Sequence, residues 1–221
     1  MTWNLPNILT VFRTLAAPAV LIVFLLLKRP HADMVALALF ITASLTDYFD
    51  GYLARKWKQT SAFGTMLDPI ADKAMVIIAI ATLLALFGLS WLIALPASVI
   101  LLREVFVSGL CEFLGDNADK IKVTKLAKWK TAMQMTAIGI LFGYQIFEHF
   151  FGMSILGMNN QIVGAILSGE EEDHVGLVWK YTAATWSFYG GVGLFWVAAI
   201  LTLVSGVDYL RKAMPFFKEA L

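Results

Sequence analysis

The chain has 221 residues, of which 59% are hydrophobic and 15% are charged, and its formal net charge is +1. This composition lies far on the apolar side of soluble proteins and excludes an ordinary water-soluble globular fold. The one cysteine, Cys111, excludes a disulfide within the chain.

Six apolar stretches approach or exceed the roughly 20 residues that a helix needs to cross about 30 Å of hydrocarbon. In chain order, we expect membrane helices at residues 8–27, 34–57, 66–88, 91–114, 127–150 and 187–209. The sequence therefore predicts an all-α polytopic membrane protein, a bundle of six transmembrane helices with both termini on the same side.

Positive charge is distributed unevenly between the two sides of this arrangement. Most lysine and arginine residues fall on the side of the termini, in the segments 55–58, 120–130 and 211–218. The positive-inside rule therefore assigns the termini to the cytoplasm, and the acidic run at 169–173 to the outside.

No fixed-period repeat and no linker divides the chain, so residues 1–221 are predicted to form a single domain. The only long connection is 151–186. Its apolar run is too short to span a membrane, and we interpret it as an external loop with room for an interfacial helix.

The first predicted helix has a polar face. Asn7, Thr10 and Arg13 recur every three residues, so they share one side of a helix and can point into the bundle near its cytoplasmic end. The alternative for Arg13 is an extended side chain that reaches lipid headgroups.

Acidic residues gather on the second and third predicted helices. One face of the second helix has Asp47, Asp50, Gly51 and Ala54, with Arg55 at its border. The third helix has Gly64, Asp68 and Asp72 at intervals of four residues. A tight hairpin across the basic loop 56–63 would bring the two faces together.

Four ionised aspartates at membrane depth would cost on the order of 10 kcal/mol, because insertion scales assign about 2.5–3.5 kcal/mol to each. Arg55 and Lys73 compensate two of the four. Divalent cations can supply the remainder, and Mg²⁺ or Mn²⁺ suit a carboxylate site better than zinc. A structural ion-pair network and a proton or cation pathway remain as alternatives.

Metal ions and Arg55 at a cytoplasmic membrane surface favour an anionic substrate that carries phosphate. The residues alone thus indicate metal-dependent phosphoryl chemistry on a lipid or a nucleotide.

The spacing Asp47-x-x-Asp50-Gly51-x-x-Ala54-Arg55, then eight residues, then Gly64-x-x-x-Asp68-x-x-x-Asp72 resembles the complete signature of the CDP-alcohol phosphotransferase family. The resemblance implies a six-helix membrane fold, commonly homodimeric, with two divalent metal ions in a cavity that faces the cytoplasm. Family members transfer a substituted phosphoryl group from a CDP-linked donor to an alcohol and release CMP.

Similarity within the family extends from residue 4 to about 136, and is greatest to members that use CDP-diacylglycerol and glycerol 3-phosphate. It implies a bacterial cytoplasmic membrane. A related acceptor such as inositol phosphate is the alternative within the family. A cation-coupled transporter is the alternative outside it, but the acids cluster on one hairpin with no repeat, which favours the enzyme.

The resemblance also assigns roles to residues. The metal ligands are Asp47, Asp50, Asp68 and Asp72, and Asp72 is in addition the candidate catalytic base, with a purely ligating role as its alternative. The candidates for binding the CDP donor are Thr10, Arg13, Gly51, Arg55 and Ser61.

The acceptor carries its own phosphate and therefore needs cations. We expect Arg103 and Lys125 to bind it, in preference to Lys128 and Lys130. A salt bridge between Arg103 and Glu104 is the alternative for the arginine, and a loop made basic by membrane topology is the alternative for the lysines.

Overall fold

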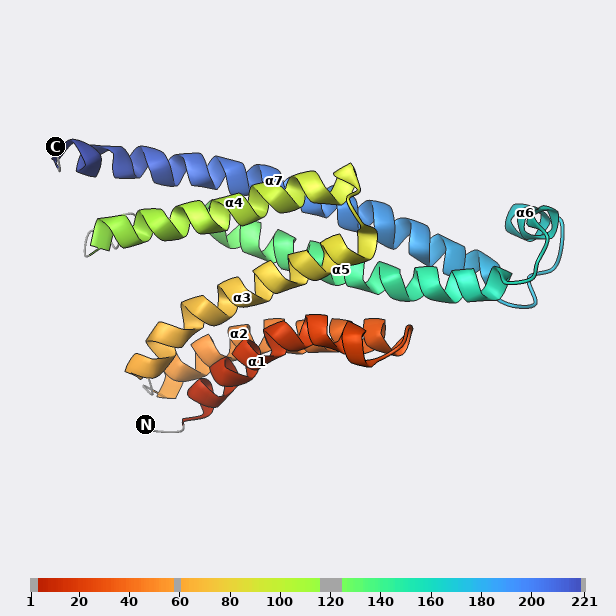
Figure 1. The fold of residues 1–221 in the computed structure, drawn as a ribbon, viewed down its shortest axis with the longest axis horizontal. Helices are drawn as coiled ribbons and strands as arrows, with labels where there is room; N and C mark the ends of the chain where they lie inside the picture. Colours follow the sequence, from red (N-terminus) through yellow and green to blue (C-terminus); the bar gives the residue numbers. More distant parts are fainter. Residues whose placement is uncertain (1–3, 58–60, 116–124, 220–221) are drawn as a thin grey trace. The chain divides into compact units, whose positions relative to one another are not determined.

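A computed structural model describes residues 4–57, 61–115 and 125–219; within these ranges it gives no account of the side chains of Pro6, 47–57, 125–128 and 218–219. All secondary structure in the described ranges is helical, which confirms the predicted all-α class (Figure 1). The helices are α1 (Leu5–Leu26), α2 (His31–Trp57), α3 (Ala62–Phe87), α4 (Trp91–Leu114), α5 (Lys125–Ile155), α6 (Asn160–Ser168) and α7 (Leu177–Glu219).

Four helices in the described part of the chain are long and apolar enough to cross a membrane, namely α1, α3, α4 and α7. A fifth span results if α5 and α6, which are bent by 118° at their junction, count as one broken span. The described apolar part of α2 ends at Thr46 and is shorter. A multi-pass membrane protein is thus supported, whereas the six-helix bundle and its cavity stay predictions.

The bounds agree best for α4, which was predicted at 91–114 and runs from Trp91 to Leu114. The largest difference is α7, which has 43 residues and extends past both predicted ends at 187 and 209. Asp173 explains its early start, because its carboxylate accepts hydrogen bonds from the backbone N–H of Leu177 at 2.6 Å and of Val178 at 2.9 Å.

The predicted external loop 151–186 contains structure of its own. Helix α6 lies within it, its first turn capped by Asn159, whose side chain accepts from the N–H of Gln161, and it ends at Gly169 in the left-handed conformation. Helices α5 and α7 also extend into this range. Its position outside the membrane stays a prediction.

The chain divides into two compact units, whose boundaries fall inside α3, α5 and α7. Unit 1 comprises residues 1–82 and 138–191, and unit 2 comprises 83–137 and 192–221. The prediction of a single domain over 1–221 stays a prediction.

In unit 1, α1 packs along α2 (Figure 1). Small side chains at the buried positions let the two backbones approach closely: Ala16, Ala17, Ala32, Ala36 and Ala43 are all at most 3% exposed. The second half of α5 runs antiparallel to the start of α7, because Tyr144 contacts Phe188 while Phe151 contacts Tyr181.

In unit 2, α4 and the last part of α7 run side by side in the same direction. Trp91 contacts Trp196 near one end, and Phe113 stacks on Phe217 at the other, with ring centroids 4.9 Å apart. The indole N–H of Trp196 also donates to the carbonyl of Leu92 at 3.0 Å. This common direction is expected if α4 is the fourth and α7 the sixth membrane span, because every second span crosses the membrane in the same direction.

Candidate active site at the start of α3

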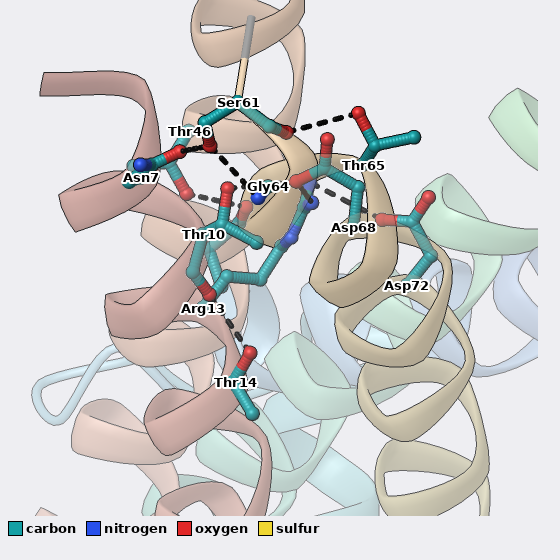
Figure 2. A network of polar contacts seen from close by, with 11 residues as sticks. Asn7, Thr10, Arg13, Thr14, Thr46, Ser61, Gly64, Thr65, Asp68 and Asp72 are labelled. Carbon is teal, nitrogen blue, oxygen red and sulfur yellow. Dashed lines mark hydrogen bonds and ion pairs between the residues drawn. The ribbon is translucent and has the colours of Figure 1, made fainter. Parts of the chain in front are cut away.

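The polar face of α1 is buried, as predicted. Asn7 is 5% exposed, and Thr10 and Arg13 are each 2% exposed, although they lie close to the start of the chain. The alternative prediction for Arg13, a side chain that extends to lipid headgroups, is therefore wrong. Its guanidinium instead points toward α3 (Figure 2).

Two aspartates of α3 contact this polar face. Thr10 donates its hydroxyl hydrogen to Oδ1 of Asp68 at 2.7 Å. Arg13 lies with Nη1 at 3.2 Å from Oδ1 of Asp72 and with Nη2 at 3.7 Å from Oδ1 of Asp68 (Figure 2). One arginine thus bridges two carboxylates one helical turn apart.

The two carboxylates are not enclosed. The side chain of Asp68 is 49% exposed and that of Asp72 is 53% exposed. Each carboxylate therefore contacts Arg13 and is also partly accessible to solvent. An accessible, oxygen-rich surface beside a buried cation can bind a metal ion or a polar substrate.

The start of α3 is fixed by Ser61. Its hydroxyl oxygen accepts from the backbone N–H of Gly64 at 3.0 Å, which is the geometry of a helix N-cap. The same hydroxyl donates to Oδ1 of Asn7 at 2.7 Å and so links α3 to α1. The helix was predicted to begin at 66; it begins at Ala62, and the capping serine was the signal for the earlier start.

Gly64 permits this close approach of α1 and α3. A Cβ atom added there would lie 2.8 Å from Oδ1 of Asn7 and 3.3 Å from Oγ of Ser61. Packing between helices therefore accounts for this glycine.

The other half of the predicted site is on α2. Asp47, Asp50, Gly51 and Arg55 belong to this helix, but their side chains lie outside the described residues. The last described side chain before them is Thr46, whose hydroxyl donates to the carbonyl of Ala43 at 2.8 Å. Figure 2 draws Thr46 beside the network of Asn7 and Ser61. The convergence of all four aspartates stays a prediction.

The donor atoms present suit a hard divalent cation. Carboxylate oxygens of Asp68 and Asp72 are the ligand type that Mg²⁺ and Mn²⁺ prefer. Among the described residues there is no group of three or more histidine, cysteine, aspartate or glutamate side chains that could hold a metal ion. A site with three or more carboxylate ligands here would need Asp47 or Asp50 in addition.

A second polar cluster lies in unit 2. Nη1 of Arg103 is 3.3 Å from Oε1 of Glu104, and its guanidinium lies over the ring of Tyr209, 5.4 Å from the centroid. Lys130 on α5 also donates to Oε1 of Glu104 and is only 4% exposed. The predicted alternative for Arg103, a pair with Glu104, is therefore present.

Lys125 was predicted, in preference to Lys130, to bind the acceptor phosphate together with Arg103. In the structure it is Lys130 that contacts Glu104, the residue beside Arg103. The side chain of Lys125 lies outside the described residues. A glutamate inside an apolar helix needs a cation, but only the packing of α4 on α5 shows which lysine supplies it.

The model of the CDP-alcohol phosphatidyltransferase family matches residues 3–166. The match covers α1 to α5, most of α6, and both halves of the aspartate signature. The chain belongs to this family, and the resemblance seen in the sequence is confirmed.

Three relatives carry the same name, CDP-diacylglycerol–glycerol-3-phosphate 3-phosphatidyltransferase. The relative from Cereibacter sphaeroides is 52% identical over 220 residues, which are 99% of both chains. Those from Salmonella choleraesuis and Escherichia coli are 33% and 32% identical over 215 residues, which are 96% of each chain.

Proposed function

We propose that this protein transfers the phosphatidyl group of CDP-diacylglycerol to glycerol 3-phosphate and releases phosphatidylglycerophosphate and CMP. The observation that carries the proposal is the full-length likeness, at 52% identity, to a relative named for this reaction. The bridge from Arg13 to Asp68 and Asp72 lies within the residues 3–166 that match the family.

Two divalent ions, Mg²⁺ or Mn²⁺, would be held by Asp47, Asp50, Asp68 and Asp72. When bound, such ions stabilise negative charge on the attacking and leaving oxygens of a phosphoryl transfer. The carboxylates of α3 support this assignment, because the side chains of Asp68 and Asp72 are 49% and 53% exposed.

Asp72 is the proposed base. The glycerol hydroxyl oxygen bonds to the phosphorus that bears diacylglycerol, the bond from this phosphorus to the bridging oxygen breaks, and CMP takes that oxygen. The hydroxyl proton passes to Oδ of Asp72. A side chain that is 53% exposed is accessible to the acceptor, while Arg13 at 3.2 Å holds its orientation.

For the donor, Gly51 leaves room for the cytidine and Arg55 pairs with the diphosphate, since a guanidinium makes two parallel hydrogen bonds. Thr10, Arg13 and Ser61 are secondary candidates. Their described contacts are with Asp68, Asp72 and Asn7, so we assign to them first the orientation of the carboxylates and only second a contact with the donor.

For the acceptor phosphate we retain Arg103 and Lys125, and we add Lys130. Arg103 and Lys130 share one carboxylate, that of Glu104, which leaves one positive charge in excess. A phosphate group would neutralise this excess in surroundings where a charge is costly.

We also propose that the protein is a homodimer in the cytoplasmic membrane, with its termini and its active site facing the cytoplasm. The charge distribution supports the orientation. The dimer rests on the family resemblance alone.

The decisive experiment measures CMP release from CDP-diacylglycerol by the purified protein. We expect release with glycerol 3-phosphate, loss of activity with a chelator, and recovery on adding Mg²⁺ or Mn²⁺. Equal or greater release with inositol phosphate would instead identify the related acceptor. An absence of CMP with either acceptor and either metal would refute the transferase and favour cation transport.

A further inference from the structure

A hydrogen-bonded joint connects α1 to α3 just before the candidate site. Its members are Asn7, Ser61 and Gly64, which we call the α1–α3 joint (Figure 2). Asn7 is 5% exposed, and Gly64 is buried. Ser61 is a secondary candidate for donor binding in the function proposed above, whereas Asn7 has no role in it.

The joint acts at the point where α3 begins. Ser61 caps the helix through the N–H of Gly64, and the same hydroxyl is bound by Oδ1 of Asn7. Because the helix is continuous from Ala62, a displacement of its first turn is passed to Asp68, less than two turns further on.

The contact at Gly64 leaves little freedom. An added Cβ would lie 2.8 Å from Oδ1 of Asn7, a distance at which the Asn7 side chain must shift. The separation of α1 and α3 is thus tied to the place of the Asn7 side chain at this point. The same separation determines how Thr10 and Arg13 of α1 meet Asp68 and Asp72 of α3.

We infer that Asn7 is a positioning residue for the reaction: by accepting the hydroxyl hydrogen of Ser61 it fixes the start of α3, and thereby the place of Asp68 and Asp72 in the metal site. Asn7 acts through Ser61 and not on the substrate. The inference rests on the proposed function, because it assigns a task toward the metal ions of that function.

The test is a double-mutant cycle with Asn7→Ala, Ser61→Ala and the double variant. The measured quantities are Mn²⁺ binding by electron paramagnetic resonance, kcat, and KM for glycerol 3-phosphate. We expect each single variant to weaken Mn²⁺ binding and lower kcat by about 10–100-fold, the usual range for groups that orient metal ligands. KM for glycerol 3-phosphate should stay unchanged.

The double variant should be no worse than Ser61→Ala, because Ser61→Ala already removes the hydrogen bond to Asn7 together with the cap on Gly64. Ser61→Thr retains the hydroxyl and should recover most of both quantities. Thr14→Ala is the matched control, since the Thr14 hydroxyl donates to the Thr10 carbonyl within α1, at 2.8 Å; it should behave as the unchanged protein does.

Additive losses, or Mn²⁺ binding and kcat unaffected by Asn7→Ala, would overturn the inference. Amide hydrogen exchange over residues 64–72 gives a measurement that needs neither metal nor substrate. It should rise in Asn7→Ala and not in Thr14→Ala, and no rise would also overturn the inference. If the unchanged protein bound Mn²⁺ but released no CMP, the proposed function would fail, and the Mn²⁺ cycle would still decide the role of Asn7.

Discussion

At the scale of single residues, Arg13 satisfies two electrostatic requirements of the site. A buried guanidinium needs anionic partners, and two neighbouring carboxylates need a cation. The three-residue spacing of Asn7, Thr10 and Arg13 predicted their shared face. The partners on α3 were not predictable, because the choice between α2 and α3 is made by tertiary packing and leaves no local pattern.

Arg13 gives the first substitution test. Arg13→Gln should lower kcat for CMP release by at least about 10-fold, because Asp68 and Asp72 lose the group that orients them. Arg13→Lys should be intermediate, since one ammonium cannot bridge two carboxylates as a guanidinium does. Lys212→Gln, which removes an exposed pair with Asp208, serves as control. A normal rate in Arg13→Gln would mean that the bridge has no part in the reaction.

At the scale of helices, hydropathy predicted the positions of the long apolar helices better than their ends. The bounds of α4 agree because Ser90 precedes it and Gly115 follows it, both recognisable in sequence. The full extent of α7 was missed because its ends are amphipathic: they extend the helix without extending the apolar stretch. Its N-terminal cap, Asp173, lies in an acidic run that indicated only a loop.

The turn between α1 and α2 has a structural charge pair that bears on stability. Asp33 is fully buried, and its Oδ2 accepts from Nε of Arg29 at 2.8 Å. Nη2 of Arg29 donates to the backbone carbonyl and to Oε1 of Gln145 on α5, both at 2.9 Å. The pair therefore joins the turn before α2 to both α2 and α5 in unit 1.

Removing this pair should destabilise the fold. We expect Asp33→Asn to lower the free energy of unfolding by about 1–3 kcal/mol, because the buried group loses a charge-assisted hydrogen bond. Thermal unfolding in detergent measures the change. Asp208→Asn is the matched control: it breaks a pair of the same i, i+4 spacing whose side chains are 37% and 38% exposed, and should cost no more than about 0.5 kcal/mol. Equal shifts for both variants would contradict the role of burial.

The cap of α7 predicts a dependence on pH. Hydrogen bonds from the backbone N–H groups of Leu177 and Val178 hold the pKa of Asp173 below its ordinary value. Since the folded pKa is lowered, the cap stabilises the fold fully above the unfolded pKa of about 3.9 and loses this effect as pH falls through the folded pKa. The Tm of the unchanged protein should therefore fall more steeply below about pH 4 than that of Asp173→Asn, which keeps a capping oxygen without the charge. Parallel Tm curves would refute the assignment.

At the scale of the whole molecule, helix directions within each unit agree with alternating passage through the membrane. In unit 1, α1 runs antiparallel to α2 and parallel to α3, since Asn7 meets Ser61 and Arg13 meets Asp72. In unit 2, α4 and the end of α7 run in the same direction. These alternating directions of α1, α2 and α3 require that α2 also crosses the membrane.

The number of crossings is testable by labelling cysteines with an impermeant maleimide in the Cys111→Ser background. Six spans place Leu5→Cys and Met214→Cys on the cytoplasmic side, where only inverted vesicles are labelled, and Glu171→Cys on the outside, where intact cells are labelled. Five spans, without a crossing by α2, would instead put Leu5 and Met214 on opposite sides. Both of these positions are exposed in the structure, which favours reaction.

The length of α7 has a geometric consequence. At about 1.5 Å per residue, its 43 residues measure about 65 Å, twice the thickness of the hydrocarbon layer. Even at a tilt of about 40°, the largest usual in membranes, a helical segment of this length exceeds the hydrocarbon thickness. If α7 crosses the membrane once, part of it therefore lies outside the hydrocarbon, and shortening that part by one turn should leave the transmembrane stretch intact.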